Sequence, residues 1–390
     1  MKFLECFMAS LKLGLTSFGG PVAHLAYFRE AYVERLKWLN DQKFAELLAI
    51  CQFMPGPASS QLGAAIGYHR GGWLGGLAAW LGFTLPSAVL LIILASNLDN
   101  INSWVGSGWI HGLKVVAVAV VAMAIIGMKK KLCPDVKTTV IALVVAVVLC
   151  FVREAWLQPL MILAGGVLGA FLFKGAGSEK SVVEKKEKKK FPRISLVGLS
   201  LFVVATIGLS WMTISSNDGQ MMRGMVKTGA MVFGGGHVVL PLLEAEVVNT
   251  GLMKQQEFLA GYGAAQAVPG PMFTLSAFLG AQVPMFGNSW VGGLVALACI
   301  FLPGMILLSI GMPLWNYFKD NAVVRSGLSG ANAAVVGLLI AALVHILRAG
   351  ALTGWIDVAV AVALFAVLYS KKAPVWSIVL VGAVIGGVVG

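Results

Sequence analysis

FGGPVAH at residues 18–24 and MPGP at 54–57 both interrupt long apolar runs of the chain. The second half repeats this pattern, with FGGGHVV at 233–239 and VPGP at 268–271. Proline removes a helix hydrogen bond, and glycine adopts backbone angles that other residues avoid. The sequence therefore predicts helices that are broken inside apolar segments, twice in each half of the chain.

The composition is that of a membrane protein. Hydrophobic residues make up 58% of the 390 positions, charged residues only 12%, and the mean hydropathy is +0.86. A soluble domain has about 25% charged residues, so most of this surface must face lipid. Apolar runs of bilayer-crossing length recur without the alternation of barrel strands, which predicts an all-α polytopic membrane protein.

We predict about thirteen transmembrane spans, the first of them retained because no small-residue cleavage site follows it. The predicted spans are 4–26, 43–66, 73–96, 108–128, 137–152, 155–173, 194–215, 221–243, 257–280, 289–314, 327–348, 352–370 and 374–390.

Lysine and arginine, which are enriched in cytoplasmic loops, orient these spans. Their distribution favours a cytoplasmic N-terminus, a cytoplasmic linker and an external C-terminus in the plasma (inner) membrane. The first loop carries Arg29, Arg35, Lys37 and Lys43 and falls on the external side in this topology. A re-entrant first segment would return that loop to the other side, so both readings of the FGG segments stay open.

The two halves are copies of one unit. KLGLTSFGG (12–20) matches KTGAMVFGG (227–235), and GGLAAWLGFTLPS (75–87) matches GGLVALACIFLPG (292–304). We divide the chain into a first repeat (1–173), a basic linker (174–193), a connecting helix (194–215) and a second repeat (216–390). Six spans per copy and one between them would invert the second copy, as in many secondary transporters.

The breaks suit an anion. A half-helix that begins inside the membrane presents unpaired N–H groups and the positive end of its dipole. Hydroxyl donors follow each Pro-Gly-Pro (Ser59 and Ser60, then Thr274), and Gln52 and Gln266 lie one turn before it. Close helix packing is the alternative explanation for such glycines and prolines.

Charged and titratable residues near the breaks have two readings each. Lys12 and Lys227 stand at matching places inside spans and either add positive potential to an anion pathway or extend to the membrane interface. His24 and His237 follow the two glycine breaks and are either proton carriers or structural histidines. Glu244 and Glu246 either cap a helix end or take part in proton coupling.

Other functions find little support. The five cysteines are scattered without metal-binding spacing, so we predict no metal, no cofactor and no catalytic site. Much of the net charge of +12 lies in the 174–193 linker, typical of a solvated cytoplasmic loop that touches anionic lipid. We therefore expect the lipid bilayer as a partner and no nucleic acid.

At these motifs the sequence resembles the chromate ion transporter (CHR) family in its long, two-domain form. The resemblance covers both copies and implies export of chromate driven by the proton motive force, with sulfate as a related tetrahedral dianion. The family's motif residues carry over onto Phe18, Gly19, Gly20, Pro21, His24, Gln52, Pro55, Gly56, Pro57, Phe233, Gly234, Gly235, Gly236, Gln266, Pro269, Gly270 and Pro271.

We therefore predict a secondary active oxyanion carrier, most readily a chromate exporter working by alternating access, coupled to protons or to a counter-anion. A homodimer is also considered. The alternatives are a carrier for sulfate or another oxyanion, in either direction, and a passive anion channel. A membrane enzyme such as a chromate reductase would need redox ligands that this sequence does not supply.

Overall fold

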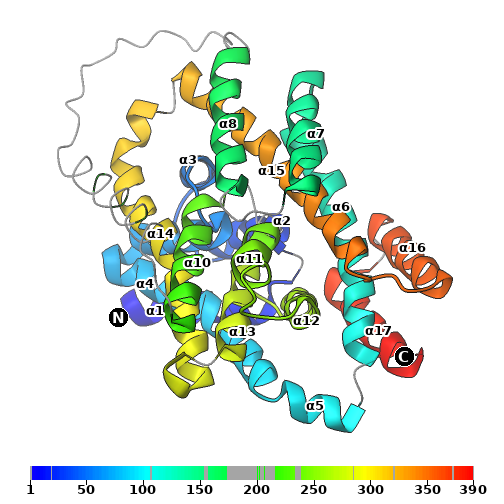
Figure 1. Cartoon of the computed structure of the whole chain (residues 1–390). Coiled ribbons are helices and arrows are strands. Elements are labelled where there is room, and N and C mark those ends of the chain that lie inside the picture. Colours follow the sequence, from blue (N-terminus) through cyan, green and yellow to red (C-terminus); the bar gives the residue numbers. More distant parts are fainter. Residues whose placement is uncertain are drawn as a thin grey trace.

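The computed structural model folds as a bundle of helices (Figure 1). It describes residues 2–18, 20–105, 108–152, 157–173, 216–232, 239–283, 285–318, 321–370 and 373–389, and the single positions 200, 202 and 206. Within these ranges every regular element is a helix, in agreement with the predicted all-α class. The predicted linker and most of the predicted connecting helix lie outside the described residues.

The first half contains one π-helical turn and eight α-helices among its described residues. Their bounds are α1 (Lys2–Thr16), α2 (Gly20–Phe28), η1 (Arg29–Arg35), α3 (Asp41–Phe53), α4 (Ala58–Ser96), α5 (Leu98–Val105), α6 (Gly108–Leu132), α7 (Val136–Phe151) and α8 (Leu157–Leu172). The second half contains α10 (Asn217–Met231), α11 (Val239–Val247), α12 (Gln255–Ala267), η3 (Met272–Thr274), α13 (Leu275–Gln282), η4 (Met285–Gly287), α14 (Ser289–Phe318), α15 (Ala322–Arg348), α16 (Trp355–Tyr369) and α17 (Val375–Val389).

Four of the described helices are long and apolar enough to cross a membrane: α4, α6, α14 and α15. Shorter apolar helices, among them α7, α8, α16 and α17, accompany them. The chain is thus a multi-pass membrane protein. The count of thirteen crossings stays a prediction, because several predicted spans are broken into short helices or lie outside the described residues.

The long helix α4 folds back on itself at Gly71 and Gly72, whose backbone angles are not helical. A Cβ added to Gly67 would lie 2.4 Å from the carbonyl oxygen of Gly75. Residues eight apart in a straight helix are separated by about 12 Å, so this contact requires a hairpin. The predicted spans 43–66 and 73–96 therefore separate at this turn. In the second half Gly280 of α13 meets Gly292 of α14 in the same way.

The last two helices of each half pack against the other half. α7 and α8 contact α15, whereas α16 and α17 contact α6 (Figure 1). Glycines make both contacts close: a Cβ on Gly330 would lie 2.0 Å from the Gly165 carbonyl oxygen, and one on Gly112 would lie 2.0 Å from that of Gly382. Contacts that are exchanged reciprocally in this way are what a two-fold relation between two copies generates.

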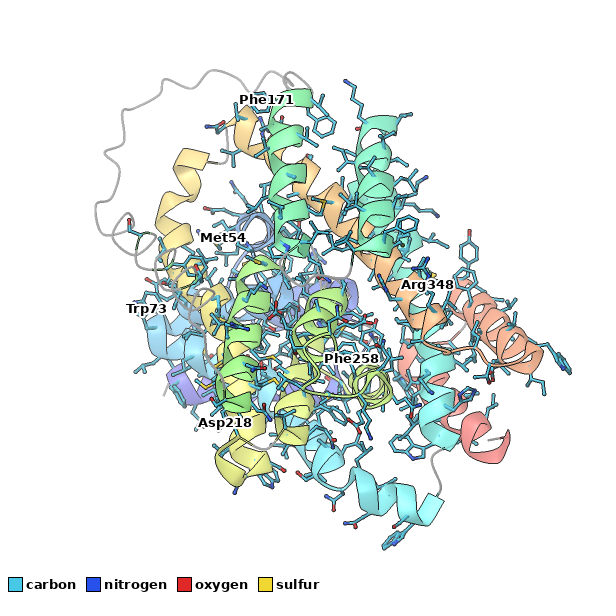
Figure 2. The ribbon with its side chains drawn as sticks, in the orientation of Figure 1. Met54, Trp73, Phe171, Asp218, Phe258 and Arg348 are labelled. Carbon is cyan, nitrogen blue, oxygen red and sulfur yellow. The ribbon has the colours of Figure 1, made fainter. Side chains whose placement is uncertain are left out.

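Apolar residues form both the interior and much of the outside. Phe258 is fully buried in the middle of the bundle, while Trp73 is 65% exposed at its margin (Figure 2). Exposed aromatic and aliphatic side chains recur on α7, α8 and α16. A surface of this kind is expected to face lipid rather than water.

Candidate functional site

The two Pro-Gly-Pro segments break the chain at the predicted places and begin with the same backbone conformation. α3 ends at Phe53 and α4 begins at Ala58, whereas α12 ends at Ala267 and η3 begins at Met272. Met54 and Val268, which end the first helix of each pair, have nearly identical angles (φ −87°, ψ 147° and φ −86°, ψ 146°). The glycines follow with φ of 128° and 105°, values that glycine tolerates best.

Each of these glycines is hydrogen-bonded to the FGG break of the opposite copy. The Gly56 N–H donates to the Val232 carbonyl at 2.7 Å, and the Gly270 N–H donates to the Ser17 carbonyl at 2.9 Å. Val232 and Ser17 occupy matching positions, each directly before the phenylalanine of an FGG motif. Each Pro-Gly-Pro break is therefore joined to the residue that precedes the FGG motif of the other copy, and we call these two exchanged contacts the crossing.

The N–H groups of Gly56 and Gly270, within the breaks themselves, are satisfied by carbonyls of the other half. The prediction of unpaired N–H groups concerned the start of the half-helix that follows each break, and there it stays a prediction. The donors left for an anion must come from the first turns of the following helices and from side chains.

A second reciprocal contact braces the crossing. Gly56 lies against Gly304 of α14, and Gly270 lies against Ser87 of α4. The Gln61 side-chain amide donates to the Pro55 carbonyl at 3.1 Å and to the Gly304 carbonyl at 2.9 Å. Gln61, Ser87 and Gly304 were not among the predicted site residues. Ser87 and Gly304 could have been found from the sequence, because they end the matching triplets LPS and LPG.

Buried polar atoms without a hydrogen-bond partner gather on the segments that form this crossing. They are the hydroxyl oxygens of Ser17, Ser60, Thr84 and Thr228, the Oε1 atom of Gln61, and both ring nitrogens of His24. Leaving a buried polar group unpaired costs about 1–3 kcal/mol. Native proteins rarely carry such atoms in a group unless water or a ligand completes their hydrogen bonding.

His24 is fully buried at the start of α2. Its ring centroid lies 5.2 Å from that of Phe83 in an edge-on arrangement and 6.5 Å from that of Phe28. The neighbouring Phe18 is half-buried, and its ring lies 5.5 Å from that of Trp376 on α17. His24 thus lies among aromatic rings and next to the Ser17 backbone.

The polar residues that flank Pro-Gly-Pro occupy different surroundings. Ser59 and Ser60 are buried in the first turn of α4. The Thr274 hydroxyl donates to the Pro271 carbonyl at 2.7 Å and so belongs to the turn itself. Gln52 is exposed, whereas the Gln266 amide is directed at the sulfur of Met272 at 3.4 Å.

The two matched lysines also differ. Lys12 is exposed on α1. Lys227 pairs with Glu246 of α11 at 2.5 Å, with side-chain exposures of 17% and 7%. The positive charge of Lys227 is therefore balanced by a carboxylate.

Some predicted site residues cannot be placed. Gly19, Phe233, Gly234, Gly235, Gly236 and His237 lie outside the described residues. Gly20 and Pro21 begin α2. Pro55, Pro57 and Pro269 belong to the two breaks described above.

A cavity of about 420 Å³ lies between α4 and α14. Its walls include Trp73, Leu77, Trp80, Met305 and Leu308. Such an apolar wall would not replace the hydration of a dianion, so this cavity does not fit an oxyanion. Among the described residues, no group of three or more His, Cys, Asp or Glu side chains is arranged to hold a metal ion.

The sequence matches the chromate transporter family over residues 4–170 and 219–387. An uncharacterized transporter of Methanocaldococcus jannaschii is 27% identical over 98% of this chain and 93% of its own length. A chromate transport protein of Pseudomonas aeruginosa is 25% identical over 87% and 80%, respectively. A chromate transport protein of Cupriavidus metallidurans is 26% identical over 86% and 80%. No solved structure matches the chain.

Proposed function

The chain belongs to the chromate transporter family, and from this premise we propose that it is a secondary active carrier of tetrahedral oxyanions, with chromate as its substrate. The family is one of transporters rather than enzymes. The observation that carries the proposal is the group of buried, unsatisfied polar atoms on the segments that form the crossing.

A dianion inside a membrane protein needs many hydrogen-bond donors, and donors to a charged acceptor form shorter and stronger bonds. Ser17, Ser60 and Thr84 offer hydroxyl donors, and His24 offers a ring N–H. The first turn of α4 adds backbone N–H groups and the positive end of a helix dipole. Uncharged donors can bind the dianion and still release it, because they place no permanent positive charge in the site.

The two halves are proposed to be inverted in the membrane, with the two-fold axis in its plane and the breaks near its middle. The reciprocal contacts Gly56–Val232 and Gly270–Ser17 support this relation. Rocking of one repeat against the other would then open the crossing to each side in turn. In this arrangement the N-terminus and the linker are cytoplasmic, the C-terminus is external, and chromate leaves across the plasma membrane.

The test is flux in vesicles that contain the purified protein. We expect saturable chromate uptake, competition by sulfate, and accelerated exchange when chromate is present on both sides. Flux that follows the anion gradient without exchange acceleration would identify a passive channel. Sulfate transport without chromate transport would identify a sulfate carrier. The imposed pH gradient and a counter-anion are varied separately to find the driving force.

A matched pair of serine variants tests the site itself. Ser60→Ala removes a buried hydroxyl at the crossing, whereas Ser329→Ala removes an exposed hydroxyl that bonds to the Arg325 carbonyl. Loss of a hydrogen bond to a charged group costs about 1.5–3 kcal/mol, so the KM for chromate should rise about tenfold or more in Ser60→Ala. Equal KM values for both variants would contradict the assignment.

A further inference from the structure

The helix that follows the second FGG break is buried along its whole length and carries two carboxylates. All nine residues of α11 are buried, including Glu244 and Glu246, each 7% exposed. Buried ionisable groups in a membrane protein are expensive and mark functional positions more often than structural ones. Glu246 is accounted for by its ion pair with Lys227 of α10. Glu244 points to a different neighbourhood.

Glu244 lines a small cavity that is separate from the crossing. The cavity has a volume of about 30 Å³ and lies where α8 of the first half meets α11 and α15 of the second. Its polar lining consists of Glu244, Asn249, Gln158 and His345, and the rest is apolar. The Oε1 atom of Gln158 is buried there without a hydrogen-bond partner. A water molecule needs about 10–15 Å³ and two to four polar partners, so this space suits one or two waters.

The hydrogen bonds of the cavity define which atoms can gain a proton. The Gln255 amide donates to Glu244 Oε1 at 2.8 Å. His345 Nε2 lies 2.9 Å from the Leu149 carbonyl oxygen, an acceptor only, so Nε2 must carry the hydrogen. His345 therefore gains or loses its second proton at Nδ1. A carboxylate and an imidazole in one small wet space are the usual means of holding a transferable proton.

We propose that Glu244 and His345 form the proton-binding site that couples transport to the pH gradient, a role that rests on the proposed carrier function. A proton fits better than a metal ion or sodium, because the cavity is too small for a hydrated ion and offers only one carboxylate. Protonation of Glu244 would remove a buried negative charge from α11, the helix that follows the second FGG motif in the sequence. The equilibrium between the two orientations of the repeats would then depend on pH.

The other charged groups on the elements packed against α11 are few. α10 carries Asp218, Arg223 and Lys227, of which Lys227 is paired with Glu246. On α12, Glu257 accepts from the Lys254 backbone N–H, and on α15, Arg348 donates to the Cys150 carbonyl. The described residues of α8 include no ionisable side chain.

The test uses Glu244→Gln and His345→Gln in the full chain, with Glu257→Gln as a matched control on the neighbouring helix. Two transport readouts are compared in vesicles: chromate uptake driven by a pH gradient, with internal pH recorded by a dye, and chromate exchange at equal pH. We expect Glu244→Gln to lose gradient-driven uptake at least tenfold, together with the accompanying proton flux. Its exchange at equal pH should stay within about twofold of the wild type and lose its pH dependence.

The outcomes separate this proposal from the carrier function. If the wild type exchanges chromate and both cavity variants keep gradient-driven uptake with the wild-type pH dependence, the proton site is wrong and the carrier stands. Uptake driven by a sodium gradient instead would also overturn it. If the wild type exchanges no oxyanion, the carrier function fails. Infrared difference spectra on a pH step then still test the site, because a carboxyl band absent from Glu244→Gln supports it and an unchanged spectrum refutes it.

Discussion

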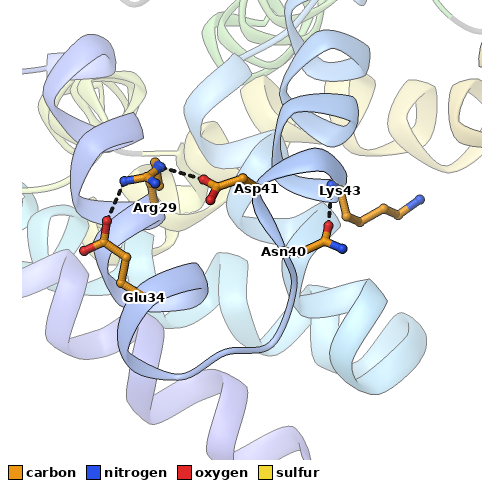
Figure 3. A network of polar contacts seen from close by, with 5 residues as sticks. All are labelled: Arg29, Glu34, Asn40, Asp41 and Lys43. Atoms are coloured by element: carbon orange, nitrogen blue, oxygen red, sulfur yellow. Dashed lines mark hydrogen bonds and ion pairs between the residues drawn. The ribbon is translucent and has the colours of Figure 1, made fainter.

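After the first FGG break the chain carries Arg29, and at the matching place after the second break it carries Glu244. Arg29 is exposed and bridges to Asp41 at 2.7 Å and to Glu34 at 2.5 Å (Figure 3). Glu244 is buried and bonds to Gln255, which stands at the position of Asp41 in the second copy. In both halves one side-chain contact, which we call the tether, joins the segment after the FGG break to the helix before Pro-Gly-Pro. In the first half the tether is an exposed ion pair, and in the second it is a hydrogen bond between an amide and a buried carboxylate.

The two halves therefore share backbone features but differ in their charged and titratable side chains. The Pro-Gly-Pro turns, the hairpins and the crossed hydrogen bonds recur in both copies. The charged and titratable groups do not, because each copy meets a different set of neighbours. Four comparisons of matched positions test this difference.

The largest difference is expected between the two matched lysines. Lys227→Met leaves Glu246 buried without its partner, and breaking a buried pair in this way costs about 3–5 kcal/mol. Lys12→Met changes an exposed side chain and should leave stability nearly unchanged. Thermal unfolding in detergent measures both.

The double variant Lys227→Met/Glu246→Gln is the control, because it removes both charges and should recover part of the lost stability. Equal destabilisation by the two lysine variants would contradict the structural difference. Loss of chromate flux in Lys12→Met at unchanged stability would support the sequence-based assignment of Lys12 to the anion pathway.

Replacement of Gly56 or Gly270 by alanine should lower stability by a similar amount, because the two breaks are alike in both halves. A Cβ on Gly56 would lie 2.6 Å from Gln61 Nε2, and one on Gly270 would lie 2.8 Å from Ser87 Oγ. Both glycines also have positive φ, so alanine should cost about 1–3 kcal/mol at either position. Gly127→Ala, where a Cβ meets nothing within 4 Å, serves as the control. A stable Gly270→Ala beside an unstable Gly56→Ala would show that the two breaks are not equivalent.

The two tethers should differ by a smaller amount. Gln255→Leu removes a hydrogen bond to a buried carboxylate, a loss of about 1.5–3 kcal/mol. Asp41→Asn weakens only an exposed ion pair, and such pairs contribute little. Asp41 holds the pKa of Arg29 above its ordinary value. Arg29 also stays charged without Asp41, because a guanidinium is not deprotonated at neutral pH. Unfolding midpoints compare the two variants, and a larger effect of Asp41→Asn would reverse our reading of the tethers.

The smallest effect concerns helix caps. Asp135 caps α7 by accepting from the Thr138 backbone N–H at 2.8 Å, whereas the matching helix α16 is capped from inside by Asp357, which accepts from the Thr353 N–H at 2.7 Å. Asp135→Ala should cost about 1 kcal/mol at neutral pH.

The cost of Asp135→Ala should depend on pH with a defined sign. Hydrogen bonding from the Thr138 backbone holds the pKa of Asp135 below its ordinary value. Its contribution is therefore complete above that ordinary value and disappears as the pH falls through the lowered pKa. The stability gap between wild type and variant should shrink in acid. A gap that is independent of pH would show that the charge of Asp135 is not involved.

Sequence patterns predicted the fold where a feature depends only on residues that are close together in the chain. Pro55 and Pro269 stand where helices end, each followed by a glycine with positive φ, whereas Pro86 lies inside α4, so the complete Pro-Gly-Pro motif was the reliable signal. Thr274 has a role that such reasoning did not predict, because its hydroxyl donates to the Pro271 carbonyl and closes the turn. Gln61 was missed because its importance arises from Gly304, a residue of the opposite copy.

By itself, the sequence determined the membrane-protein class, the duplication and the positions of the breaks, because these follow from hydropathy, repeated motifs and backbone chemistry. Tertiary structure decided which groups meet. It paired Gly56 with Val232, gave Lys227 a carboxylate partner and left Lys12 exposed, and it brought Glu244 and His345 to one cavity. Such contacts depend on how two distant segments pack, and a pattern of neighbours along the chain does not contain that information.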